Sequence, residues 1–129
     1  MENYVSDDPD KNIEKLEESL RELEQYLSSQ KKDYRGLIEV SWIELSQHCY
    51  SVNNAMQLFH FGIRNTHEMQ VDHILGLCDR FSSVTDTILS NASQCPDALY
   101  RRIAHFGVAT RIRAKELLLR EKRKQRKER

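Results

Sequence analysis

The sequence predicts an all-α fold: an antiparallel four-helix bundle, or a coiled-coil-like helical domain, with a basic helical extension at its C-terminus. Turn-forming residues are scarce, since only four of the 129 residues are glycine and two are proline. Strands joined by hairpins would need more of them. Hydrophobic residues also recur at alternating spacings of three and four, the period of a helix with one buried face. These two observations argue against all-β and α/β folds.

The charges are sorted along the chain although they sum to zero. Residues 1–30 carry nine acidic and three basic residues, whereas residues 99–129 carry three acidic and twelve basic ones. The chain is therefore bipolar, acidic at its beginning and basic at its end.

The first helix is predicted over residues 8–30. Asp8 can cap the free amides of the first turn, and Pro9 suits the first helical position because no amide hydrogen is needed there. The hydrophobic residues that follow form a heptad-like seam: Ile13, Leu16, Leu20, Leu23 and Leu27. This helix either belongs to an intramolecular bundle or protrudes as a coiled coil that pairs with another chain. Two heptads are short for an independent coiled coil, which favours the bundle.

A break is predicted over residues 28–36, a polar stretch that ends in Gly36, a residue suited to a left-handed helix cap. A continuous helix is the alternative, because Leu27, Tyr34 and Ile38 also keep a helical spacing.

The second helix is predicted over residues 36–61 and has the most regular hydrophobic seam of the chain. Its members are Ile38, Trp42, Leu45, Cys49, Val52, Met56, Phe59 and Ile63. Leu37, Ala55 and Leu58 widen this stripe, which indicates contact with more than one neighbouring helix. We expect Trp42 to anchor the core.

The third and fourth helices are predicted over residues 67–92 and 96–122. Pro96 separates them, because it disfavours helical geometry at the preceding residue and suits the start of a new helix. The third helix has an apolar side of Met69, Ile74, Leu77, Cys78, Phe81, Val84 and Ile88. The fourth is expected to turn inward Leu99, Ile103, Phe106, Ala109 and Ile112, with Leu117, Leu118 and Leu119 as a last apolar patch.

The predicted domain organisation is one helical bundle over residues 8–119, flanked by a disordered segment at 1–7 and a basic tail at 120–129. The tail holds seven basic and two acidic residues and no hydrophobic ones. Its helix propensity is high but it has nothing to bury, so we expect it to be frayed or disordered without a partner.

The sequence gives no sign of catalytic or metal chemistry. Five histidines and three cysteines are present, but no CxxC or HxxxH pair delivers two zinc ligands from one element. No glycine-containing nucleophile turn, phosphate-binding loop or Glu-x-x-His pair occurs either. We therefore expect no enzyme activity, no metal and no cofactor. The cysteine pattern is typical of reduced intracellular thiols, and no apolar run approaches the ~20 residues of a membrane span.

The leading functional hypothesis is a non-catalytic helical adaptor or scaffold subunit within a larger complex. It would bind protein partners, as a homo- or hetero-oligomer, because the chain has more hydrophobic seam residues than so small a bundle needs. The candidate protein-interaction residues are Leu16, Leu20, Leu23, Leu27, Tyr34, Trp42, Met56 and Phe59.

The alternative hypothesis is association with nucleic acid through the basic C-terminal helix. The candidate phosphate contacts are Arg111, Arg113, Lys115, Arg120, Lys122, Arg123, Lys124, Arg126 and Lys127. Because the sequence has no recognition-helix context, zinc finger or aromatic residues among the cations, such contacts would be to the phosphate backbone. Residues 122–127 are also typical of a nuclear-import signal. We therefore expect an intracellular protein, with the nucleus slightly favoured over the cytoplasm.

Overall fold

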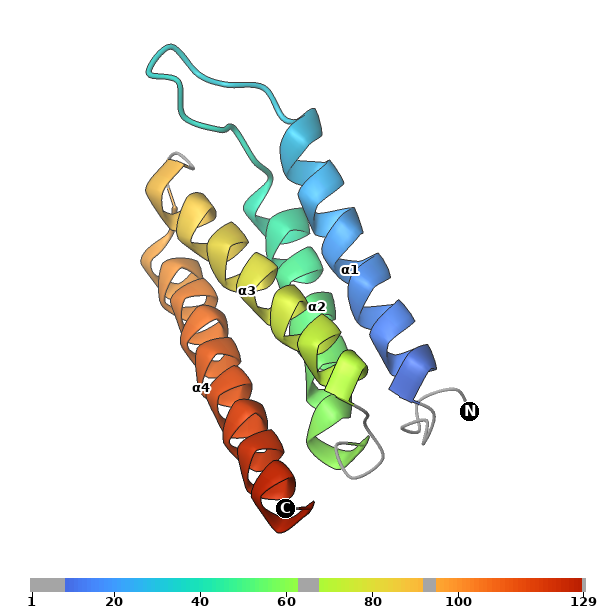
Figure 1. Cartoon of the computed structure of the whole chain (residues 1–129). Coiled ribbons are helices and arrows are strands. Elements are labelled where there is room, and N and C mark those ends of the chain that lie inside the picture. The colour runs from blue at the N-terminus through green and yellow to red at the C-terminus, as the bar shows by residue number, and fades with distance from the viewer. Residues whose placement is uncertain (1–8, 63–67, 92–94, 129) are drawn as a thin grey trace.

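The computed structural model describes residues 9–62, 68–91 and 95–128, and it confirms the all-α fold and the bundle. Four helices make up the chain: α1 (Pro9–Ser29), α2 (Trp42–Gly62), α3 (Glu68–Asn91) and α4 (Asp97–Glu128) (Figure 1). Within the described ranges there is no strand, only an isolated antiparallel bridge between Lys32 and Ile38. A separate check of the described helices found none that is both long and apolar enough to cross a membrane.

Consecutive helices run antiparallel, but the order around the bundle differs from the order in the chain (Figure 1). The most extensive packing is between α1 and α2 and between α3 and α4, and α1 also packs on α3 while α2 packs on α4. The neighbours around the bundle are therefore α1, α2, α4 and α3. It follows that α1 and α3 lie side by side and parallel on one face, and that α2 and α4 do the same on the other.

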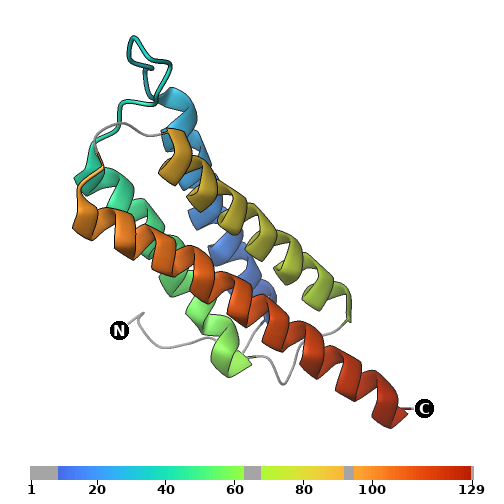
Figure 2. The ribbon, with the colours of Figure 1, turned by 90° about the vertical axis from the view of Figure 1, so that its left-hand side faces the viewer.

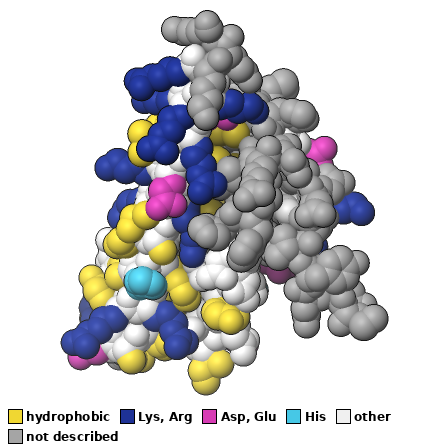
Figure 3. All heavy atoms as spheres, turned by 90° about the horizontal axis from the view of Figure 1, so that it is seen from below, with side chains coloured by type: hydrophobic (Ala, Val, Ile, Leu, Met, Phe, Trp, Pro, Cys, Tyr) yellow, Lys and Arg dark blue, Asp and Glu magenta, His cyan; other side chains and the backbone are white. Residues whose placement is uncertain are grey.

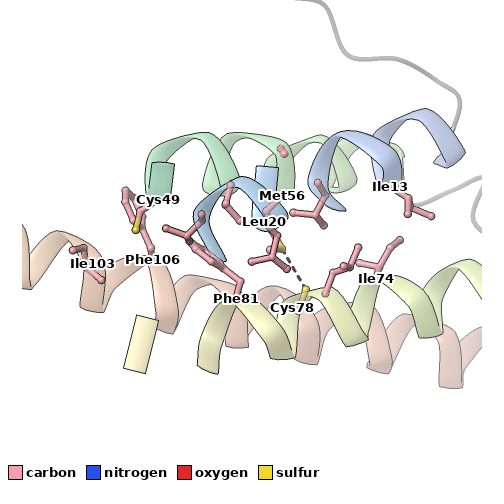
Figure 4. Close-up of a cluster of buried hydrophobic side chains, with 14 of the residues drawn as sticks. Ile13, Leu20, Cys49, Met56, Ile74, Cys78, Phe81, Ile103 and Phe106 are labelled. Carbon is pink, nitrogen blue, oxygen red and sulfur yellow. Dashed lines mark hydrogen bonds between the residues drawn. The ribbon is translucent and has the colours of Figure 1, made fainter. Parts of the chain in front are cut away.

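One hydrophobic interior receives side chains from all four helices (Figure 4). Its largest fully buried members are Leu16, Leu20, Leu23, Leu45, Val52, Met56, Val71, Ile74, Leu77, Phe81, Ile88 and Ile103. The leucine seam of α1 is thus part of the chain's own core, as the intramolecular interpretation requires. Trp42 lies at the edge of this core, half-buried and packed against it.

The predicted break after the first helix is confirmed, but the second helix begins at Trp42, six residues later than residue 36. Ser41 starts it: the Ser41 carbonyl accepts a hydrogen bond from the Leu45 amide at 2.9 Å, and its Oγ lies 3.5 Å from the Glu44 amide. Serine followed by glutamate three residues later is a capping box. The Tyr26 hydroxyl of α1 accepts a hydrogen bond from the Ser41 amide at 2.9 Å, which holds the cap against the first helix.

Residues 30–41 form an ordered connection in which Asp33 replaces helical hydrogen bonds. Its Oδ1 accepts from the amides of Arg35 and Leu37, at 2.8 and 3.0 Å. Gly36 lies in the left-handed region at φ 81°, which favours glycine. Burial alone would raise the pKa of Asp33, but the Arg35 side chain and the two amides outweigh that effect and lower it. The ionised carboxylate therefore organises the connection.

Helix α4 does not end near residue 122 and has no disordered basic tail: it is helical through Glu128. Its C-terminal turns extend beyond the other three helices (Figure 2). Strong helix formers, together with a preceding helix that is already nucleated by packing, explain this difference. A second correction concerns Ile112, which was expected to face inward but is 53% exposed, while Leu117 is the buried residue of the last apolar patch.

Some predictions fall on residues outside the described ranges. They concern the segment at 1–7, Ile63, and the side chains of Leu58, Phe59 and Met69.

Helices α3 and α4 approach closely where Gly107 faces Thr85. A Cβ placed on Gly107 would lie 2.7 Å from Thr85 Oγ1. That hydroxyl is buried and donates to the Ser82 carbonyl at 2.8 Å, and a β-branched side chain has few other rotamers to adopt. The contact therefore requires glycine at position 107.

We expect Gly107→Ala to lower the free energy of unfolding by about 1 kcal/mol, because overpacking of about 1–3 kcal/mol exceeds the gain of about 1 kcal/mol in helix propensity. Urea denaturation followed by circular dichroism measures this change. Gly76→Ala is the matched control, because a Cβ there meets nothing within 4 Å, and it should stabilise the protein. Adding Thr85→Ala should relieve the Gly107→Ala defect. Equal stabilisation by both glycine substitutions would contradict the close contact.

Candidate interaction surface

Exposed large hydrophobic side chains are distributed unevenly over the four helices. Among the side chains that the structure describes, those on helices all belong to α2 and α4: Ile43, Tyr50, Tyr100, Val108, Ile112, Leu118 and Leu119. The described side chains of α1 and α3 include none. Since α2 and α4 are neighbours, the face they share is the candidate interaction surface.

On α4 the exposed hydrophobic residues form a row on the side opposite the core. Val108 is 50% exposed and Leu119 48%, with the exposed Ile112 between them. Their spacings of four and seven residues place them within about 40° of one another around the helix. Lys115 and Arg126 are exposed and continue the same row. This row, Val108, Ile112, Lys115, Leu119 and Arg126, is called the α4 outer row below.

On α2 a second row follows the same spacing. Ile43 is 73% exposed and Tyr50 54%. Exposed polar residues without charge continue it at spacings of three and four: Gln47, Asn54 and Gln57. These five residues are called the α2 outer row. Only one residue of α2, Glu44, is a carboxylate, lysine or arginine.

A hydrogen bond between the two helices fixes their relative height. Arg113 Nη1 donates to Asn53 Oδ1 at 3.1 Å, and Asn53 is buried. Tyr50 lies one turn before Asn53, and Ile112 precedes Arg113 directly. Tyr50 and Ile112 therefore lie at similar heights on the same face of the bundle, where one partner could contact both.

The helix order converts the charge asymmetry of the chain into two oppositely charged faces. Helices α1 and α3 together contain ten acidic and four basic residues, whereas α2 and α4 contain five acidic and eleven basic ones. Seen from the end of the bundle where α4 terminates, basic side chains gather on one side with hydrophobic ones between them (Figure 3). The candidate surface is therefore both apolar and positively charged.

The predicted protein-interaction residues are divided between the core and the surface. Leu16, Leu20, Leu23 and Met56 are buried within the bundle. Leu27 and Trp42 are half-buried and packed against the core. Tyr34 is 95% exposed in the α1–α2 connection, with the Arg35 guanidinium 5.4 Å from its ring centre. The Phe59 side chain lies outside the described residues. The structure does not bring these eight residues together on one surface.

The predicted phosphate contacts all lie on α4, and two of them have partners within the bundle. Arg111 Nη2 pairs with Asp86 Oδ2 of α3 at 2.6 Å, and Arg113 bonds to Asn53. The exposed ones are Lys115, Arg120, Lys122, Arg123, Lys124 and Arg126. The Lys127 side chain lies outside the described residues. Arg111 and Arg113 thus also tie α4 to its two neighbours.

The cysteines and histidines of the described residues do not assemble a reactive or metal-binding centre. No group of three potential ligands occurs among them. Burial raises the pKa of the Cys49 thiol to about 12 and that of Cys78 to about 11, so both remain protonated core side chains at neutral pH. Cys78 Sγ lies 3.3 Å from Met56 Sδ (Figure 4). His48 packs against the Tyr26 ring, with centroids 5.0 Å apart.

Sequence analysis missed the residues that make the surface hydrophobic, notably Ile43, Tyr50 and Val108. The signal was present in the chain: each of these two helices has a second set of residues at spacings of three and four, on the side opposite the core row. A helix with two such rows exposes one of them unless neighbours cover both.

Comparison with known proteins found no match among protein-family models, curated proteins or solved structures. The chemistry of the surface is therefore the basis on which a function can be inferred.

We expect Arg113→Met to lower the free energy of unfolding by about 1–3 kcal/mol, because it removes the donor that satisfies a buried amide oxygen. Lys115→Met is the matched control, since Lys115 is exposed and its loss should change stability by less than about 0.5 kcal/mol. Urea denaturation monitors both variants. Adding Asn53→Leu to Arg113→Met should recover part of the loss, because both polar partners are then gone. Equal stability of the two single variants would show that Arg113 has no structural role.

Proposed function

We propose that this chain is a non-catalytic helical interaction module that joins a larger assembly through the outer face of α2 and α4. The supporting observation is that the exposed large hydrophobic side chains of the described helices are confined to this face. A contiguous exposed hydrophobic surface is typical of an interaction site. The earlier hypothesis of an adaptor subunit is kept, but its contact residues are now Ile43, Tyr50, Val108, Ile112 and Leu119.

The energetics of this face suit a partner of moderate affinity. Complete burial of an aliphatic or aromatic side chain contributes about 1.5–3 kcal/mol, and these five residues are already about half-buried in the bundle. Their remaining burial therefore opposes an association cost of about 4–15 kcal/mol only in part. The exposed cations of α4 would supply steering and further affinity toward an acidic partner.

The protein-interaction proposal predicts that Ile112→Glu abolishes partner binding without unfolding the bundle, because the side chain is exposed and the new charge would be buried in the interface. Quantitative co-purification of the tagged chain from its native cell measures the retained proteins. Gln25→Glu on α1 is the control, since it adds the same charge at an exposed site on the opposite face. A retained set that is identical for Ile112→Glu and the wild-type chain would refute the proposal.

A second candidate function, association with nucleic acid, is favoured by the shape of α4. Its end extends beyond the bundle (Figure 2), and the exposed cations after Leu119 are Arg120, Lys122, Arg123, Lys124 and Arg126. At 100° per residue they cover about 200° of the helix circumference. That arrangement suits phosphate contacts from several directions, and the same segment suits recognition as an import signal.

The nucleic-acid candidate predicts that truncation after Leu119 abolishes binding to duplex DNA in a gel shift at low salt. If seven phosphates are neutralised, the logarithm of the binding constant should fall with the logarithm of salt concentration with a slope of about −6. The Ile112→Glu variant should bind DNA nearly as well as the wild type, which separates this activity from the protein interface. Unchanged binding by the truncated chain would exclude the candidate.

A further inference from the structure

We infer that the partner covering the outer face of α2 and α4 is an amphipathic helix with acidic flanking residues, which lies along the two outer rows. This inference rests on the proposed function and specifies the chemistry of its partner. Two neighbouring parallel helices each present a row with helical spacing, and a third helix can place its own hydrophobic row against both.

The spacing of the rows matches a helical partner. Positions 108, 112, 115 and 119 of α4 follow one another at four, three and four residues, and positions 43, 47, 50, 54 and 57 of α2 follow the same pattern. This is the pattern by which a second helix packs its side chains between those of the first. It is also the pattern of the α1 leucines that fill the core, so each outer row has the geometry of a helix contact.

The chemistry of the α2 outer row favours a protein over a membrane or a nucleic acid. Gln47, Asn54 and Gln57 interrupt its hydrophobic residues with amides, whereas a helix lying in a bilayer surface needs a continuous apolar face. The row also lacks cations, which a duplex covering both helices would require. Amides beside hydrophobic residues are common in contacts between helices.

The charges of α4 determine where the partner's acidic residues belong. Exposed cations flank the α4 outer row from Lys115 to Arg126, and α2 ends at Gly62 while α4 continues past it. The partner's carboxylates should therefore lie on the flank beside α4 and concentrate toward the end that overlies residues 115–126. A second copy of this chain is a poor occupant, because the described side chains of its acidic helix α1 expose no large hydrophobic residue.

A pair of synthetic peptides tests the inference with the full chain. Both are 18-residue helices with leucine at alternating spacings of three and four, and they differ only in the flanking residues, which are glutamate in one and lysine in the other. Fluorescence anisotropy should show the glutamate peptide binding at least tenfold more tightly. A scrambled glutamate peptide, with its leucines spread around the helix, should bind at least tenfold more weakly than the ordered one.

Two variants assign the binding to the predicted rows. Ile112→Glu should weaken the glutamate peptide at least tenfold, and Lys115→Glu combined with Lys122→Glu should reverse the preference so that the lysine peptide binds more tightly. Amide chemical shifts should change on α2 and α4 and not on the outer side of α1 and α3. Circular dichroism checks that each variant is folded.

The outcomes separate this inference from the proposed function. Equal binding of both ordered peptides, or shifts centred on α1 and α3, would overturn the inference. So would preferential binding to phosphatidylserine vesicles, or an Ile112-dependent dimer in light scattering. If neither peptide binds while Ile112→Glu still loses its cellular partners, the interaction module stands and the acidic helical partner is wrong. If Ile112→Glu keeps its cellular partners, the proposed function itself fails.

Discussion

A four-helix bundle can bury only one side of each helix, and α2 and α4 carry hydrophobic residues on two sides. In α1, isoleucine and leucine occupy a single row and the remaining surface is charged or polar, so the fold satisfies that helix completely. In α4, Ile103, Phe106 and Leu117 take the inner side, which leaves Val108 and Ile112 on the outer side. The candidate interaction surface is the part of the hydrophobic pattern that one bundle cannot cover.

The order of helices around the bundle gives this surface its charge. If α4 stood beside α1 as closely as beside α2, its cations would face the carboxylates of α1 and the two poles of the chain would neutralise one another. Instead α1 neighbours α3, and α4 neighbours α2, so most of the negative and positive charge lies on opposite faces. Only a few pairs cross between the faces, such as Arg111 with Asp86. The overall neutrality of the chain therefore coexists with a strongly basic recognition face.

The polar contacts between helices determine where elements begin and how they are aligned. Tyr26 and Ser41 set the start of α2 against α1, and Arg113 and Asn53 align α4 with α2. Thr85 and Gly107 bring α3 and α4 close together. Each contact involves residues far apart in the sequence or of ordinary type, so none of them has a local sequence signal apart from the Ser41–Glu44 capping box. Together they turn a nonspecific hydrophobic interior into one aligned arrangement.

The sequence by itself determined the helical class, the number of helices and most of the core, because helical periodicity is a local property and rows such as Leu16, Leu20 and Leu23 are visible without coordinates. It also determined the basic character of the last helix. Only the tertiary structure decided which of two rows on α2 and α4 is buried, since that depends on which helices become neighbours. For the same reason it moved Ile112 from the predicted core to the surface, and it assigned Arg113, a predicted phosphate contact, a hydrogen bond within the bundle.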